Sequence, residues 1–204
     1  MIESIKTYCD SLIKEFNSIS VERKLILEQI TQYISENKTI KKPINLVYIC
    51  THNSRRSHFG QIWAKVAAHY YNIDNVKTFS GGTEATAFNV NAINAIKKIG
   101  FDIDKKNDDI NPIYHLYFDK NEKPITCFSK VYNDDANPRS EFAAIMTCSD
   151  AEENCPFIAG AELRIGTTYD DPKAFDNTTL QDAKYDERCK QIALETFYIF
   201  SKIK

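Results

Sequence analysis

Residues 44–57 have the sequence INLVYICTHNSRRS, and this segment decides the expected fold. The apolar run at 46–49 is rich in β-branched and aromatic residues, which is typical of a buried strand. Cys50 ends the run, and the next seven residues are polar or basic. Apolar residues then recur at helical spacing over 59–70. The segment therefore predicts a strand, a polar loop and a helix, with Arg56 at the start of the helix.

A loop that leads into a helix N-terminus points several backbone N–H groups into one small space, and the helix dipole adds partial positive charge there. A tetrahedral oxyanion fits such a space, and Arg56 can donate two parallel hydrogen bonds to it. The same field favours the thiolate of Cys50, which makes its sulfur nucleophilic. Ser57 can donate a hydrogen bond to that sulfur. The expected oxyanion-binding residues are Thr51, His52, Asn53, Ser54, Arg55, Arg56 and Ser57.

The alternative is that Cys50 is a buried apolar residue and Arg56 a solvated one, since a cysteine six residues before an arginine also occurs by chance. The strand before the loop and the helix after it favour the catalytic interpretation. The run CTHNSRRS also resembles the signature loop of the low-molecular-weight protein tyrosine phosphatase fold family, which includes the thioredoxin-coupled arsenate reductases. Two positions depart from that loop. His52 replaces a usual glycine, and Arg55 replaces a frequent second cysteine.

The composition is that of an ordinary globular protein, with 204 residues, 43% hydrophobic residues and a net charge of −2. The length suffices for one domain with an appendage. The charge does not indicate binding to nucleic acid or an acidic membrane surface, and no apolar run approaches the length of a transmembrane helix. Six cysteines without a secretion signal favour a cytoplasmic protein that uses thiol chemistry over a disulfide-stapled one.

Residues 1–42 predict an N-terminal extension of two helices, the second capped by Ser20, before a main domain at 43–204. The extension could pack on the domain, form a dimer contact or cover the active site, and we favour simple packing. After the first helix of the domain, 76–79 predicts a second strand and 89–101 a helix. The SGGTEA turn between them also resembles the fold family. Two successive strand–helix units predict a parallel sheet, with its loops at the carboxyl edge.

Residues 104–140 predict an insertion. The stretch 102–109 is charged and typical of a loop, whereas the apolar segments 114–118 and 125–132 flank a polar turn and predict a two-stranded hairpin. Such a hairpin would extend the sheet edge or overhang the site.

A third strand at 142–147 leads into CSDAEENCP, with Cys148 and Cys155 seven residues apart. Two thiols without a nearby histidine are too few for a zinc site, so we expect no metal. The residues between the two cysteines are polar, which favours a redox pair over two unrelated thiols of the core. The segment resembles the cysteine-pair segment of thioredoxin-coupled arsenate reductases, which implies that Cys148 and Cys155 relay a disulfide from Cys50.

A fourth strand at 163–165 precedes Asp171-Pro172, and a long helix is expected over 180–203. A residue before proline is held extended. In the fold family an Asp-Pro in this loop supplies the general acid, so the resemblance implies that role for Asp171. The alternative is an aspartate that only forms the turn. Phosphotyrosine phosphatases of the fold usually have aromatic residues directly after the Asp-Pro, whereas Lys173-Ala174-Phe175 follows here, which weakens but does not remove the phosphotyrosine interpretation.

The expected fold is an α/β three-layer sandwich around a four-stranded parallel sheet, with the helical extension and the hairpin insertion. The first functional hypothesis is reduction of arsenate to arsenite through Cys50, Arg56, Asp171, Cys148 and Cys155, with thioredoxin as partner and no cofactor. The alternative is hydrolysis of phosphotyrosine or a small phosphate ester, which needs only Cys50, Arg56 and Asp171. The third hypothesis is a non-enzymatic oxyanion-binding domain, and only the unusual residues His52 and Arg55 support it.

Overall fold

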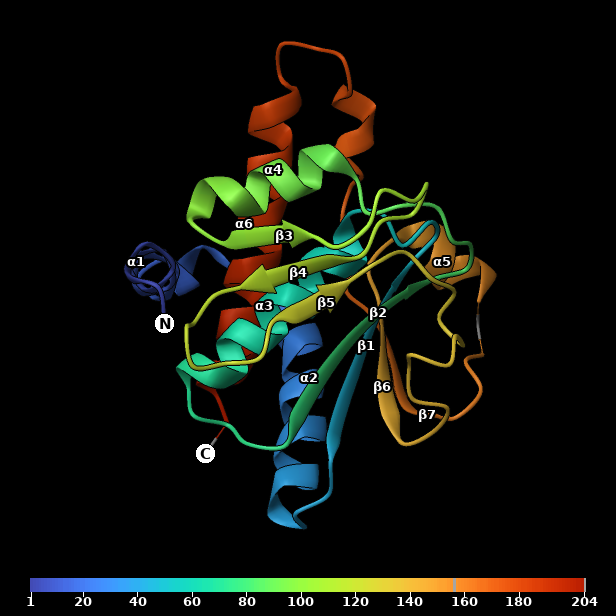
Figure 1. The fold of residues 1–204 in the computed structure, drawn as a ribbon. Coiled ribbons are helices and arrows are strands. Elements are labelled where there is room, and N and C mark those ends of the chain that lie inside the picture. The colour runs from blue at the N-terminus through green and yellow to red at the C-terminus, as the bar shows by residue number, and fades with distance from the viewer. Residues whose placement is uncertain (156, 204) are drawn as a thin grey trace.

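The computed structural model describes residues 1–155 and 157–203 and contains the predicted parallel sheet. Its strands follow the order β2-β1-β6-β7, so the strand that ends in Cys50 lies inside the sheet (Figure 1). All three neighbouring pairs are parallel. The strands are β1 (Ile44–Cys50), β2 (Val76–Gly82), β6 (Phe142–Met146) and β7 (Ala161–Gly166).

The two faces of the sheet pack against different layers. Leu46 and Tyr48 of β1 belong to a large apolar cluster with the helices on one face, whereas Val47 and Ile49 belong to a smaller cluster on the other. This alternation follows from the two-residue period of a strand. Helices α2 (Val21–Thr39) and α3 (Arg56–Tyr70) contact the first face, and α6 (Gln181–Ser201) packs against both helices in the same cluster. The short α5 (Ser149–Asn154) contacts the second face. The three-layer α/β prediction is therefore confirmed.

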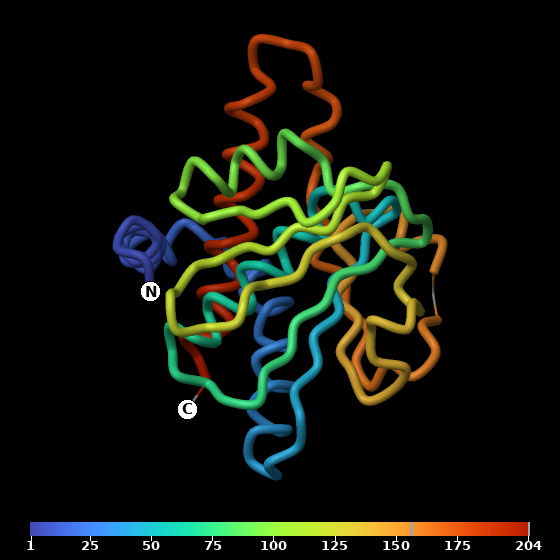
Figure 2. Tube along the Cα trace, in the orientation of Figure 1, coloured from blue at the N-terminus to red at the C-terminus, as the bar shows by residue number. Residues whose placement is uncertain are grey.

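Residues 1–42 form α1 (Glu3–Ile13), a 3₁₀ turn (Phe16–Ser18) and α2. Apolar residues of both helices are part of the same large cluster as the sheet and α6. As predicted, Ser20 caps α2, and its hydroxyl accepts from the Arg23 N–H at 3.2 Å. The Arg23 guanidinium pairs with Glu195 of α6 at 2.7 Å and donates to the Thr167 carbonyl at 2.8 Å. The N-terminal helices are thus attached to the rest of the chain. Figure 2 shows α2 lying beside β1.

The insertion differs from the expected hairpin because it has three antiparallel strands. They are β3 (Asp102–Lys105), β4 (Tyr114–Tyr117) and β5 (Ile125–Cys127), in the order β3-β4-β5. The prediction of a loop at 102–109 was wrong over β3. Only Ile103 of that strand is turned toward the interior, opposite Leu116, and its charged neighbours are exposed. Charged side chains are frequent on edge strands, and here they concealed a strand only four residues long.

The second hairpin strand was also predicted too long, because β5 ends at Cys127. The chain beyond it leaves β4 and runs beside the end of β2, where the Lys130 carbonyl accepts from the Gly82 N–H at 2.9 Å. An isolated parallel bridge joins Gly82 and Val131. The Tyr132 N–H also donates to the Gly82 carbonyl at 2.9 Å, so this segment is held at the end of β2, next to the Cys50 loop.

The remaining helices match their predicted positions. Helix α4 (Val90–Ile99) begins after Asn89, whose side chain accepts from two backbone N–H groups, and ends at Gly100 with φ at 113°. A 3₁₀ turn, η2 (Pro172–Phe175), precedes α6. Within the described residues, no helix has both the length and the apolar character that crossing a bilayer requires.

Helix α3 packs closely against β1 at Gly60. A Cβ at this position would overlap the ring of Tyr48, which is 3% exposed. Alanine normally stabilises a helix by about 1 kcal/mol over glycine. Here we predict the opposite sign, with Gly60→Ala lowering the free energy of unfolding by about 1–3 kcal/mol through overpacking. Urea denaturation monitored by circular dichroism measures it.

The matched control is the same substitution in a Tyr48→Leu background. Because the smaller side chain leaves room for a methyl group, the additional cost of Gly60→Ala should shrink or reverse there. A higher unfolding midpoint for Gly60→Ala alone would contradict the close approach.

Candidate active site

The loop between Cys50 and Arg56 turns at Asn53, which adopts a left-handed conformation with φ at 44°. Asparagine tolerates this region better than most residues. The Asn53 side chain is fully buried; it donates to the Ser57 Oγ at 2.8 Å and accepts from the Lys130 N–H at 2.9 Å. His52, which replaces the glycine of similar loops, is not in the left-handed region. Asn53 therefore takes the strained position and fixes the loop from inside.

Cys50 is 3% exposed, and its Sγ lies 3.1 Å from the Ser57 Oγ. Because the Ser57 oxygen already accepts a hydrogen bond from Asn53, its own proton is free to point at the sulfur. A hydroxyl donor in this position stabilises a thiolate over a thiol. The contact places Ser57 where the sequence analysis expected it.

The backbone N–H groups of residues 52–57 make no hydrogen bond within the described part of the chain. They lie in the loop and the first turn of α3, where helical N–H groups lack intrahelical acceptors. Buried N–H groups rarely stay unpaired in folded proteins. Six successive free donors at a helix N-terminus are a feature that binds tetrahedral anions.

Arg56 is 8% exposed and only partly satisfied. One terminal nitrogen donates to the Tyr169 carbonyl at 2.7 Å, and the other donates to the Asp171 carboxylate at 2.7 Å. Its Nε is buried and has no partner among the described residues. An unpaired guanidinium N–H beside a row of free backbone donors fits a bound oxyanion.

Asp171 lies over this arginine because its loop is stiff. The residue is extended, with φ at −81° and ψ at 120°, as expected before a proline. One carboxylate oxygen accepts from the Lys173 N–H at 3.0 Å, and the other accepts from Arg56. The carboxylate is about 30% exposed, so it is open to solvent beside the loop.

Arg55 turns its side chain away from the loop, toward α6. Its Nε donates to the Tyr185 hydroxyl at 2.6 Å, and an Nη lies 3.3 Å from Asp176. The same guanidinium is 3.9 Å from Asp171. Arg55 therefore connects the catalytic loop, the Asp171 loop and α6 into one network.

The outer side of the loop is held by further contacts. The Ser54 hydroxyl donates to the Ala87 carbonyl at 2.7 Å, and the His52 carbonyl accepts from the Ser129 hydroxyl at 3.0 Å. The His52 ring is part-exposed, with its Nε2 3.7 Å from Glu84. The loop is thus pinned to the segment after β2 and to the insertion.

Cys148 and Cys155 flank α5 at its two ends. Cys148 is 1% exposed and belongs to the same apolar cluster as Cys50, with Cys155 packed against it. The Cys148 Sγ lies 3.4 Å from the Thr51 hydroxyl and accepts from the Ala151 N–H at 3.4 Å. Thr51 also donates to Asp150 at 2.7 Å. Thr51 follows Cys50 directly, so the three thiols named from the sequence gather at one end of the sheet.

Known proteins share both the sequence pattern and the fold. The arsenate reductase of Bacillus subtilis strain 168 is 30% identical over 137 residues, which is 67% of this chain and 76% of that protein. The chain belongs to the arsenate reductase family. An arsenate reductase 2 of Staphylococcus epidermidis is 29% identical over 62% of this chain and 77% of its own length. No protein-family model matches the chain.

Solved structures confirm the fold at low sequence identity. A low molecular weight phosphotyrosine phosphatase from Vibrio cholerae aligns with a TM-score of 0.52 and 12% identity, covering 78% of this chain and 95% of its own. An arsenate reductase solved in a phosphate-binding state aligns with a TM-score of 0.51 and 14% identity, covering 79% and 99%. This member of the family therefore has the low-molecular-weight phosphatase fold.

Sequence reasoning missed two parts of the site. It expected Asn53 among the oxyanion-binding residues of the loop but did not foresee that its side chain anchors the loop to Ser57 and Lys130. It also missed Tyr185 and Asp176, which hold Arg55. The only sequence clue was the pair of arginines, since a second buried guanidinium needs partners. Those partners lie more than 120 residues away in the chain.

The other three cysteines of this family member are packing residues. Burial raises the pKa of Cys9, Cys127 and Cys189 to about 12. At pH 7.5 fewer than about one in ten thousand of these thiols is ionised, so iodoacetamide should modify them very slowly.

We predict that iodoacetamide modifies Cys50 at least about 100-fold faster than Cys9, Cys127 or Cys189 in the native protein, because burial raises the pKa of those three thiols, whereas the Cys50 sulfur lies in the loop beside the Ser57 hydroxyl. Peptide mass spectrometry after timed quenching gives the rate at each cysteine. Ser57→Ala should slow the reaction at Cys50 while leaving the rates at the three buried thiols unchanged. Equal rates for Cys50 and Cys189 would contradict the assignment.

Proposed function

We propose that this chain reduces arsenate to arsenite through a relay of Cys50, Cys148 and Cys155 that thioredoxin regenerates. The observation that carries the proposal is the place of Cys148. It is buried in the cluster of Cys50, with its sulfur against Thr51, the residue next to the nucleophile. A hydrolase needs no second thiol there. The relatives named arsenate reductase support the same assignment.

In the first step the backbone donors of residues 52–57 and the Nε of Arg56 hold the arsenate. The Cys50 thiolate forms a bond to arsenic, and one arsenate oxygen leaves as water after it accepts a proton. We assign the proton transfer to Asp171, whose carboxylate lies beside Arg56 and is about 30% exposed, so that it can take up a proton from solvent and pass it to the leaving oxygen. No redox change occurs in this step.

In the second step the Cys148 thiolate attacks the Cys50 sulfur. A disulfide forms and the sulfur–arsenic bond breaks with its electron pair left on arsenic. Arsenic(V) thereby becomes arsenic(III) and departs as arsenite, while two thiols are oxidised. The Cys148 Sγ accepts a hydrogen bond from the Ala151 N–H and lies 3.4 Å from the Thr51 hydroxyl, next in the chain to the cysteine that it attacks.

In the third step Cys155 attacks the Cys148 sulfur and releases the Cys50 thiolate. The two cysteines flank a six-residue helix, so their Cα atoms are about 10 Å apart at 1.5 Å per residue. A disulfide requires a Cα separation of about 4.4–6.8 Å. Helix α5 must therefore unwind, which breaks the contacts of Arg164 to Glu152 at 3.0 Å and to the Cys155 carbonyl at 2.8 Å.

Unwinding carries the new disulfide toward solvent, where a partner dithiol can reduce it. Cys155 is already half-buried instead of buried, and Phe157 nearby is 78% exposed. An exposed aromatic side chain beside a surface disulfide suits contact with a small redox protein. Thioredoxin is the proposed reductant on this basis.

Removing the relay thiols separates reduction from hydrolysis. We predict that Cys148→Ser and Cys155→Ser each lower thioredoxin-dependent arsenate reduction at least about 100-fold, because thiolate attack on sulfur cannot proceed without them. Both variants should keep the aryl phosphate hydrolysis of the wild type, which needs only the loop. Coupled NADPH oxidation with thioredoxin reductase and release of p-nitrophenol measure the two activities.

Phosphoester hydrolysis is the second candidate function, and one observation favours it. Cys50 contacts Ser57 and Arg56 contacts Asp171, and neither contact involves Cys148 or Cys155. Efficient hydrolysis that is unchanged in both serine variants, without arsenate turnover in the wild type, would establish this function and remove the first. Cys189→Ser is the control, since that thiol packs at a distance from the loop on α6.

The proton donor has its own test. Asp171→Asn keeps a side chain that can accept from the Lys173 N–H but has no proton of the required acidity. We predict a loss of about 100- to 10,000-fold in arsenate reduction. Asp170→Asn is the matched control, because the neighbouring carboxylate is 97% exposed and does not contact Arg56. Equal losses in both variants would contradict the role of Asp171.

A further inference from the structure

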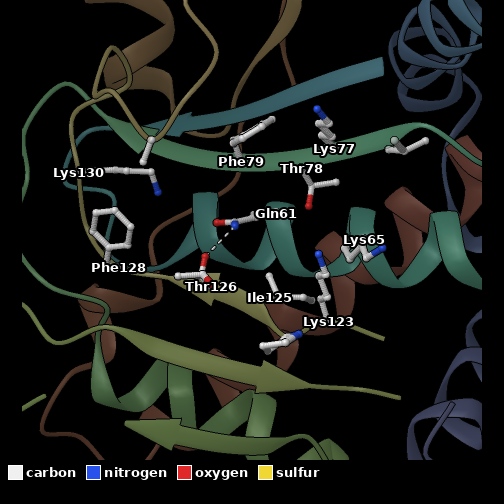
Figure 3. Close-up of a pocket in the computed structure, with 13 residues that line it drawn as sticks. Gln61, Lys65, Lys77, Thr78, Phe79, Lys123, Ile125, Thr126, Phe128 and Lys130 are labelled. Carbon is white, nitrogen blue, oxygen red and sulfur yellow. Dashed lines mark hydrogen bonds between the residues drawn. The ribbon is translucent and has the colours of Figure 1, made fainter. Parts of the chain in front are cut away.

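A cavity of about 390 Å³ lies between β2 and the insertion, with α3 at its base (Figure 3). It is separate from the oxyanion loop, and none of the catalytic candidates lines it. Its volume is within the range of small-molecule sites. The lining residues come from α3 (Gln61, Lys65), β2 (76–79) and the insertion (123–126, Phe128, Lys130, Ala136).

The cavity is strongly basic in a chain with a net charge of −2. Lys65, Lys77, Lys123 and Lys130 line it, and no carboxylate does so within the described residues. Lys65 pairs with Glu122 at 3.1 Å, whereas the other three make no ion pair in the described part of the chain. Gathering cations without counterions is unfavourable and creates a positive potential, which attracts an anion.

Lys130 is the most informative of these residues because it is 5% exposed. Figure 3 shows its side chain directed into the cavity, and its ammonium lies 4.4 Å from the centre of the Phe128 ring. Burial lowers the pKa of Lys130, although the nearby Cys127 and Asp134 act in the opposite direction. A buried ammonium without an ion-pair partner costs folding free energy, which a bound anion would offset.

The walls are suited to an apolar group. Phe79 of β2 and Phe128 of the segment after β5 both line the cavity, and the Gln61 amide donates to the Thr126 carbonyl at 3.1 Å (Figure 3). Aromatic rings and lysine stems favour a planar apolar body, while the ammonium groups favour a charged end. We infer that this cavity binds a small organic anion with an aromatic body.

The site is also connected to the catalytic loop. The Lys130 N–H donates to the Asn53 Oδ1 at 2.9 Å, and Asn53 reaches Cys50 through Ser57. A ligand that binds the Lys130 ammonium therefore contacts the same residue whose backbone N–H holds the Asn53 side chain. Occupancy of the cavity should change the environment of the Asn53 side-chain amide.

Benzoate is the probe, and benzyl alcohol is its uncharged counterpart. In ¹⁵N-labelled protein, benzoate should shift the amide resonances of Thr78, Phe79 and Lys130 and the Asn53 side-chain amide in a saturable way. Benzyl alcohol should bind at least about tenfold more weakly, because it lacks the charge. No saturable shift with benzoate up to 20 mM, or equal binding of the two probes, would overturn the inference.

Lysine-to-methionine variants test which ammonium groups bind the benzoate carboxylate. Lys130→Met keeps the apolar stem and should weaken benzoate at least about tenfold, and Lys123→Met several-fold. Lys97→Met, which removes an exposed lysine of α4, is the charge-matched control and should leave binding unchanged. Arg56→Lys should also leave binding unchanged, which separates the cavity from the oxyanion loop.

Stability gives a second readout. Without ligand, Lys130→Met should unfold at the same temperature as the wild type or higher, because it removes a buried charge. Benzoate should raise the midpoint of the wild type but not that of Lys130→Met. Unchanged benzoate affinity in both Lys130→Met and Lys123→Met would overturn the site.

Discussion

The structure depends on one constraint, which is the short connection from the end of β1 to the start of α3. Five residues between Cys50 and Arg56 leave six successive backbone N–H groups without acceptors in the described chain. That arrangement persists only because Asn53 accepts the left-handed conformation and ties the loop to Ser57 and to the insertion. The sulfur, the free donors and the guanidinium of Arg56 are positioned together by this one turn.

The parallel sheet explains how distant residues meet at that turn. Cys50 ends β1, Cys148 follows β6 by two residues, and Asp171 follows β7 by five. Since parallel strands end at the same edge, the two thiols and the carboxylate reach one region of the molecule. Helix α2 helps to hold this edge in place. Its Arg23 binds both Glu195 of α6 and the Thr167 carbonyl, which lies just before the Asp171 loop.

The insertion adds a second, three-stranded sheet to the parallel sheet and its helices. Its three strands lie apart from the parallel sheet, and its last segment returns to pair with the end of β2. This return buries Lys130, fixes Asn53 through a backbone hydrogen bond and leaves a basic cavity along β2. The same few residues thus support the oxyanion loop on one side and form a second candidate binding site on the other.

Local sequence pattern was sufficient for the strand before Cys50, the helix after it, the cap at Ser20 and the parallel sheet with its loops at one edge. These features depend on periodicity, capping and the common direction of parallel strands, all of which act over short stretches of chain. The strand at Asp102–Lys105, the partners of Arg55 and the basic cavity depended instead on contacts between segments that are far apart in sequence. An edge strand with one inward residue has no distinctive period, and a lysine becomes buried only when another segment covers it.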